Sequence, residues 1–217
     1  DVRCEALREA ISRFEQVNME EILCGNGAAE LFFAAVQAVW PQKALVIAPS
    51  FSEYEEALRS VGAEVEYYYL CEEDNFQIRG DYVDKLSEEI DMIFLCNPNN
   101  PTGQTIDRDM LIKILDRCKK QNIVVILDEC FLEFLDEPNR YEMSDLRGEY
   151  PNLLIIKAFT KIFSMPGLRL GYAISSNQDI LEEMSWKLQQ WNVSVPAQMA
   201  GVAALEKPKE YIRQTRE

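Results

Sequence analysis

The stretch MIFLCNPNNPTGQTIDRDMLIKILDRCKKQNIVVILDE, residues 92–129, decides the class of fold. It holds two short apolar runs, 92–98 and 123–129, on either side of a helical pattern at 107–121. Asp107 is a candidate N-cap for that helix. The helix has an apolar stripe made of Leu111, Ile114, Leu115 and Cys118. Two strands that are joined by a helix run parallel in one sheet, so this stretch predicts a strand–helix–strand unit.

The same alternation extends along the chain. Further runs typical of strands occupy residues 44–51, 64–70, 153–159 and 168–175, and residues 21–24 form a short additional candidate. Several runs are apolar at nearly every position, as in strands that helices cover on both faces. About eight residues separate the last two runs, which is too few for a helical crossover, so the last strand should be antiparallel. The sequence therefore predicts an α/β fold with three αβα layers and a mostly parallel sheet of about seven strands.

Three further helices are expected outside these runs. A first helix carries Leu7, Ile11 and Phe14 at helical spacing, and Pro208 suits the start of a last one. The pattern at 178–191 predicts another helix. Its apolar stripe consists of Ile180 or Leu181, Met184, Leu188 and Trp191.

Composition narrows the function. The net charge of −15 repels nucleic-acid backbones and anionic lipid, so binding to nucleic acid or to a membrane is not expected. The chain has no histidine, which removes Ser-His and Cys-His dyads and histidine metal ligation, and we expect no metal site. The six cysteines form no CxxC pair and are expected to be reduced, buried thiols of a cytoplasmic protein.

The ends of the chain suggest a domain of a longer protein. The chain starts at Asp1 with a helical pattern almost at once, and it stops inside a second helical pattern with no stop signal. We expect residues 1–217 to be one large domain that lacks an N-terminal segment and a C-terminal small domain.

Unusual residues follow the predicted strands, where open α/β sheets bind their ligands. GNGAAE (25–30) opens a helix, and is either a phosphate site or only a tight turn and cap. NPNNPTG (97–103) is either a loop that points asparagine amides into a site or a loop and no more. Asp128 ends an apolar strand and needs a cation, which a structural ion pair or a ligand would supply.

Five motifs in order, GNGAAEL, PSFSEY, NPNNPTG, LDECFLEF and TKIFSMPGLRLGY, resemble those of the class I/II aminotransferases of fold type I. Within that superfamily the wording is most similar to the branch of histidinol-phosphate aminotransferase and threonine-phosphate decarboxylase. The resemblance covers nearly the whole chain and implies that it is the large domain that binds pyridoxal 5'-phosphate.

The resemblance also implies roles for individual residues. Lys161, eight residues before Arg169, has the family spacing of the lysine that forms the Schiff base with the cofactor. Asp128 should hold the pyridine nitrogen, Asn100 the ring oxygen, and Phe51 should stack on the ring. The ligands of the cofactor phosphate would be the backbone amides of Ala28 and Ala29, the Arg169 guanidinium and, as a substitute ligand, Thr160.

Three positions differ from this pattern or compete with it. Many relatives have a tyrosine where this chain has Phe131, and a serine or threonine where it has Ala158. Lys157 has the wrong spacing for the Schiff-base lysine, and we expect it to be a strand residue that reaches solvent.

The implied reaction is amino transfer between an amino acid or amino-phosphate compound and a 2-oxo acid, with Lys161 as general base and acid. The same residues would serve a threonine-phosphate decarboxylase. Three further functions stay open: a non-catalytic sensor domain of a transcription regulator, a carbon–sulfur lyase, and a degenerate domain without cofactor. The resemblance further implies a homodimer.

Overall fold

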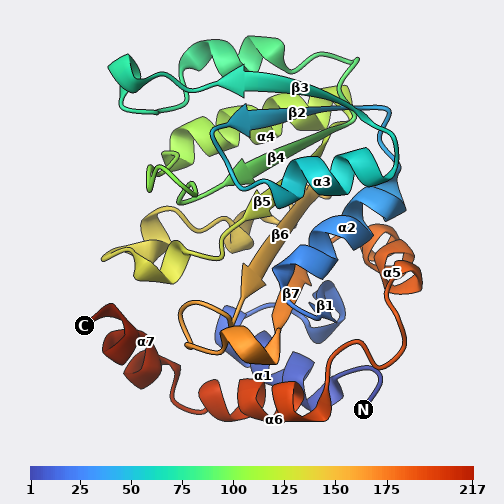
Figure 1. Ribbon diagram of the computed structural model, residues 1–217, viewed down its shortest axis with the longest axis vertical. Coiled ribbons are helices and arrows are strands. Elements are labelled where there is room, and N and C mark those ends of the chain that lie inside the picture. The colour runs from blue at the N-terminus through green and yellow to red at the C-terminus, as the bar shows by residue number, and fades with distance from the viewer.

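The computed structural model describes residues 1–217 and has a single mixed sheet of seven strands (Figure 1). The strands are β1 (Ile22–Gly25), β2 (Lys43–Ala48), β3 (Glu64–Tyr69), β4 (Met92–Cys96), β5 (Val124–Asp128), β6 (Leu153–Ala158) and β7 (Gly171–Ile174). Their order in the sheet is β1-β7-β6-β5-β4-β2-β3. β7 is antiparallel to both of its neighbours, β1 and β6, and all other pairs are parallel. The predicted mostly parallel sheet with an antiparallel last strand is therefore confirmed.

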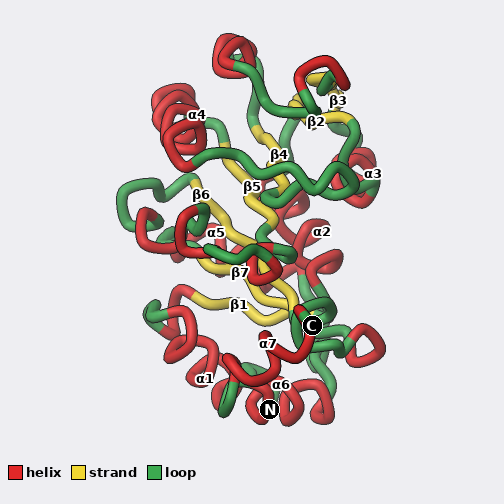
Figure 2. Tube along the Cα trace, turned by 90° about the vertical axis from the view of Figure 1, so that its left-hand side faces the viewer, coloured by secondary structure: helices red, strands yellow, loops and turns green.

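Helices cover both faces of the sheet. They are α1 (Glu5–Glu15), α2 (Ala28–Val39), α3 (Glu53–Ser60), α4 (Arg108–Gln121), α5 (Gln178–Lys187), α6 (Val195–Ala204) and α7 (Pro208–Arg216). Figure 2 shows the strands between α4 on one side and α2 and α3 on the other. The three-layer arrangement is the predicted one.

Two hydrophobic cores result from the period-two alternation along buried strands. In β5, Ile126 packs into the core under α2, α3 and α5, whereas Val125 and Leu127 pack into the core under α1, α4 and α6. Strands that are apolar at successive positions can fill both cores, which is why the central runs lacked a polar face.

Some predicted boundaries differ from the observed ones. The expected strand at 168–175 begins only at Gly171, because Pro166–Leu168 form a 3-10 turn and Arg169 has a left-handed backbone with φ of 53°. The expected helix at 178–191 ends at Lys187. Trp191 therefore lies outside the helix with φ of 65°, and its side chain is 68% exposed rather than part of an apolar stripe.

The helix starts differ from expectation in one detail. Asp107 does occupy the N-cap position of α4, but its side chain makes no capping hydrogen bond. Side-chain capping bonds occur at α5, where Asn177 accepts from the backbone amides of Asp179 and Ile180, and at α6, where Ser194 accepts from the Ala197 amide. α7 begins at Pro208, as predicted. None of the helices combines the length and the apolar character that a bilayer crossing requires.

Candidate functional site

The candidate residues gather at one edge of the sheet, because the parallel strands β2, β4, β5 and β6 all end there. Phe51 follows β2, Asn100 follows β4, Asp128 ends β5, and Lys161 follows β6. In the register of the sheet, Cys96, the last residue of β4, pairs with Asp128, the last residue of β5. Asp128 in turn lies opposite Ile156 of β6, so the fold brings the loops that carry these residues into neighbouring positions.

The N-terminus of α2 and Arg169 meet at the same edge. Gly27 is the N-cap of α2 and has φ of 84°, a conformation that favours glycine. A Cβ added at Gly27 would lie 2.8 Å from Nη2 of Arg169, and one added at Gly171 would lie 2.7 Å from the amide nitrogen of Ala28. The two glycines therefore let a guanidinium and a helix N-terminus approach closely.

This arrangement suits an anion. As first residues of a helix, Ala28 and Ala29 have amide groups with no intrahelical acceptor, and the helix dipole adds partial positive charge. The Arg169 side chain is exposed and pairs with no carboxylate of the chain, while its Nη1 makes one long hydrogen bond of 3.4 Å to the carbonyl of Pro166. The guanidinium thus retains donors for phosphate oxygens.

Asp128 is a buried carboxylate without a basic partner. Its side chain is 5% exposed and forms no ion pair with any lysine or arginine. Oδ2 accepts from the Tyr54 hydroxyl at 2.5 Å, and Oδ1 accepts from the Cys130 amide at 2.9 Å. Burial raises the pKa of Asp128, and the hydrogen bonds from Cys130 and Tyr54 oppose this only in part. A cationic N–H donor at this carboxylate would supply the missing compensation.

In the loop after β4, two asparagine side chains form hydrogen bonds within the chain and a third does not. Asn97 is buried and its Oδ1 accepts from the Ile106 amide at 2.9 Å. The Asn99 amide donates to the Pro49 carbonyl at 3.1 Å and to the Thr102 hydroxyl at 2.9 Å. Asn100 is partly exposed, and its side chain makes no hydrogen bond in the chain. Of the three asparagines in the motif, Asn100 is thus the one with free donor and acceptor groups.

Lys161 lies on the turn after β6 with an exposed side chain. Its Nζ is 5.7 Å from the centre of the Phe131 ring and pairs with no carboxylate. Thr160 is partly exposed and Ala158 is buried. Phe131, the position where many relatives have tyrosine, therefore contributes a ring face near the amine rather than a hydroxyl.

The prediction for Lys157 was wrong, because the lysine does not reach solvent. Its side chain lies on the face of the sheet that α1 covers, where it contacts Glu15, and the residue is 3% exposed. Four carboxylates surround Nζ: Glu15 at 2.9 Å, Glu142 at 3.1 Å, Glu133 at 3.4 Å and Glu129 at 3.7 Å. Sequence reasoning missed this cluster because Glu15 is separated from Lys157 by 142 positions.

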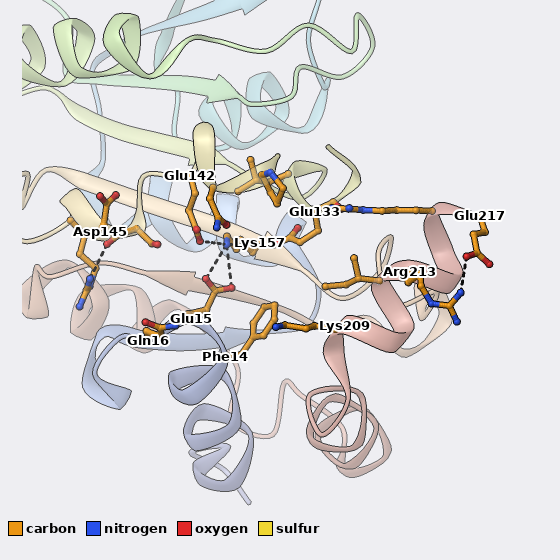
Figure 3. Close-up of a pocket in the computed structure, with 17 residues that line it drawn as sticks. Phe14, Glu15, Gln16, Glu133, Glu142, Asp145, Lys157, Lys209, Arg213 and Glu217 are labelled. Carbon is orange, nitrogen blue, oxygen red and sulfur yellow. Dashed lines mark hydrogen bonds and ion pairs between the residues drawn. The ribbon is translucent and has the colours of Figure 1, made fainter. Parts of the chain in front are cut away.

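A cavity of about 940 Å³ borders this Lys157 cluster (Figure 3). It lies between α1, the segment 132–147 and α7, and its wall includes none of the candidate cofactor residues. The candidate cofactor residues therefore lie at the strand ends and outside this cavity. Lys157 and Lys161, four positions apart, belong to two different sites.

Tyr54 contacts the candidate residue Asp128, and the sequence had assigned it no role. It lies within PSFSEY, one helical turn after Phe51, and its side chain is buried. Spacing was the available signal: residues three apart at a helix start lie on one side of the chain.

The donor set fits pyridoxal phosphate. A helix N-terminus and a guanidinium suit the phosphate, the buried Asp128 suits a protonated ring nitrogen, and Lys161 supplies an amine. The two glycines that a Cβ would crowd leave room for the backbone to approach a ligand.

Comparison with known proteins agrees with this interpretation. A sequence profile of the family described as "Aminotransferase class I and II" matches residues 2–217. Threonine-phosphate decarboxylase of Salmonella typhimurium is 36% identical over 92% of this chain and 54% of its own length. Histidinol-phosphate aminotransferase of Desulfitobacterium hafniense is 37% identical over 100% of this chain and 60% of its own length.

A solved structure shows the same fold. The histidinol-phosphate aminotransferase from Clostridium acetobutylicum superposes with a TM-score of 0.90 at 32% identity, covering 100% of this chain and 63% of that one. The chain thus spans between 54% and 60% of the length of the two curated relatives. The fold, the motif order and these similarities agree: the chain belongs to the class I and II aminotransferases, a family of pyridoxal-phosphate enzymes.

Proposed function

We propose that this chain is the cofactor-binding part of an aminotransferase that moves an amino group between an amino acid or amino-phosphate compound and a 2-oxo acid. The observation that carries the proposal is the buried Asp128, which has two hydrogen-bond donors but no cation. A structural carboxylate at this depth would be expected to have a basic partner. The carboxylate of Asp128 fits the protonated ring nitrogen of pyridoxal phosphate instead.

The other candidate residues each bind a different part of the cofactor. Arg169 and the amides of Ala28 and Ala29 hold the phosphate, with Thr160 as a further ligand from the loop after β6. Asn100 donates to the ring oxygen through its unpaired amide, and Phe51 covers one face of the ring.

When bound, pyridoxal phosphate supplies an electron sink for charge that develops at the substrate α-carbon. The protein moves the proton: Nζ of Lys161 takes it from the α-carbon as a neutral amine and returns it as an ammonium. Asp128 keeps the ring nitrogen protonated, and the Phe131 ring lies next to the Lys161 amine.

The rest of the assembly follows from the same proposal. Residues 1–217 form the large domain, which is supported by the one continuous sheet that helices cover on both faces. The enzyme is a cytoplasmic homodimer that binds neither nucleic acid nor membrane. Six free cysteines support the cytoplasm, and the net charge of −15 supports the lack of affinity for nucleic acid. The exposed Trp186, Trp191, Val195 and Met199 support a contact between subunits.

Decarboxylation of threonine phosphate is the second candidate, and the relative from Salmonella typhimurium favours it. Both reactions need the same cofactor contacts, since they differ in which bond at the α-carbon breaks. In the decarboxylase Lys161 would only return a proton.

One pair of assays separates the two reactions. The protein with pyridoxal phosphate is incubated with histidinol phosphate and a 2-oxo acid, and separately with threonine phosphate. Formation of an amino acid from the 2-oxo acid supports the aminotransferase, and release of carbon dioxide supports the decarboxylase. Neither product in the parent, or equal turnover by Lys161→Ala, would refute the proposal.

A further inference from the structure

Tyr54 joins two of the proposed cofactor contacts. It lies on α3, its residue exposure is 1%, and its hydroxyl donates to Oδ2 of Asp128 at 2.5 Å. Its ring packs edge-on against Phe51, with centroids 5.7 Å apart and an interplanar angle of 83°. One side chain therefore touches both the proposed partner of the ring nitrogen and the proposed stacking residue.

The Tyr54 ring is itself fixed by packing. It stacks on Phe94 of β4, with centroids 4.9 Å apart and planes at 18°. Phe32 of α2 meets it edge-on at 5.1 Å and 90°. A side chain that two aromatic neighbours hold in this way has little freedom to move its hydroxyl, so the bond to Asp128 has a defined direction.

The carboxylate of Asp128 is consequently held at both oxygens, by Tyr54 from α3 and by the Cys130 amide just after β5. Each carboxylate oxygen has two acceptor sites, so one further N–H donor can still bind. Without these two donors the carboxylate could rotate, and burial would favour its neutral form more strongly.

We propose that Tyr54 is a positioning residue that orients Asp128 and keeps it ionised as the acceptor for the ring nitrogen of the cofactor. The inference rests on the proposed function. A purely structural role, in which Tyr54 only fills the core under α2 and α3, would be served equally well by phenylalanine. The two roles therefore differ in what the hydroxyl alone contributes.

The hydroxyl has a pH-dependent signature. The titratable groups that face Asp128 are Tyr54 from α3, Cys96 from β4 and Cys130 after β5. Burial raises the pKa of each of these three, so they stay neutral, and Asp128 is the group whose charge the Tyr54 hydroxyl influences. Loss of the Tyr54 donor should raise the pKa of Asp128 further, and the defect should grow as pH falls.

The test compares cofactor affinity of the 217-residue chain with that of Tyr54→Phe, by titrating pyridoxal phosphate and following its visible absorbance. Tyr172→Phe is the matched control, because it also removes a buried hydroxyl that donates to a buried carboxylate, that of Glu15. Tyr172 belongs to the core on the opposite face of the sheet.

We expect Tyr54→Phe to weaken binding roughly tenfold at about pH 8, and by more at about pH 6, relative to the parent at each pH. Tyr172→Phe should bind like the parent at both. Parent-like affinity of Tyr54→Phe at both pH values would overturn the inference while leaving the proposed function intact. Equal losses in the two variants would also overturn it, because the loss would then be a general effect on stability. No binding by the parent would refute the proposed function, and the inference with it.

Discussion

Replacement of Glu129 by glutamine should change how the stability of the chain depends on pH. Glu129 is 0% exposed and lies beside Lys157, whose Nζ is 3.7 Å from its Oε2. That oxygen has no hydrogen-bond partner. Oε1 accepts from the Met143 amide at 3.2 Å. One lysine faces four carboxylates here, and this excess of negative charge favours a neutral Glu129.

The magnitude follows from the shift of its pKa. Burial, opposed by Lys157 and assisted by Glu142, Glu133 and Glu15, raises the pKa of Glu129 from the ordinary 4.5 to about 8. A raised carboxyl pKa means that the folded chain binds more protons than the unfolded one. The stabilisation is complete below pH 4.5 and is lost as pH rises to about 8. At about 1.4 kcal/mol for each unit, the whole interval lowers the free energy of unfolding by up to about 5 kcal/mol.

Glutamine keeps the shape and the acceptor for Met143 but does not ionise. We therefore expect the free energy of unfolding of Glu129→Gln to gain several kcal/mol on that of the parent between about pH 5 and about pH 8.5. Urea unfolding followed by circular dichroism at a series of pH values measures this difference. Glu142→Gln removes another carboxylate within 3.1 Å of Lys157 and serves as the control for lost charge.

A difference between Glu129→Gln and the parent that stays constant with pH would refute the reasoning. So would a Glu142→Gln profile that flattens by the same amount. Either result would mean that Glu129 is not the carboxyl of this cluster that stays protonated.

Three further outcomes are expected. Lys157→Met should lower the free energy of unfolding, measured by urea titration, by about 3–5 kcal/mol, because it leaves buried carboxylates unpaired. Lys113→Met, at an exposed lysine, should have little effect on the same quantity. Gly27→Ala should weaken binding of pyridoxal phosphate by displacing Arg169, whereas Gly62→Ala, with a similar φ of 79° but open space around it, should only lose stability; equal affinities would contradict this. Arg169→Gln should raise the Kd for pyridoxal phosphate roughly 10- to 100-fold, and an unchanged Kd would remove Arg169 from the phosphate site.

The sheet could be predicted because its central strands are buried on both faces and are therefore apolar at nearly every position. The ends of these elements could not. The left-handed backbone of Arg169 delays β7 to Gly171, and nothing in the local apolar pattern distinguishes Leu170, which is buried in the loop, from a strand residue. In the same way Trp191 continued an apolar stripe by spacing, although the helix ends at Lys187.

The site was predictable to the extent that its residues follow strands. Motif spacing placed Asp128 and Lys161 at the same edge of the sheet, but it gave no information on contacts across the chain. The hydrogen bond from Tyr54 to Asp128 joins positions 74 apart. Lys157 was assigned to solvent because an isolated lysine is costly to bury. The carboxylates that offset this cost come from α1 and from the segment after β5, and only the folded chain brings them together.

The central claim is that Lys161 and Asp128 form a site for pyridoxal phosphate, and one spectrum tests it most directly. The parent chain and Lys161→Ala are each mixed with the cofactor, and the visible absorbance of the protein fraction is recorded after free cofactor is removed. We predict a visible band in the parent that is absent from a folded Lys161→Ala. Buried Lys157, bound by its carboxylates, should not replace the missing amine. A band that persists in Lys161→Ala, or a parent without one, would contradict the claim.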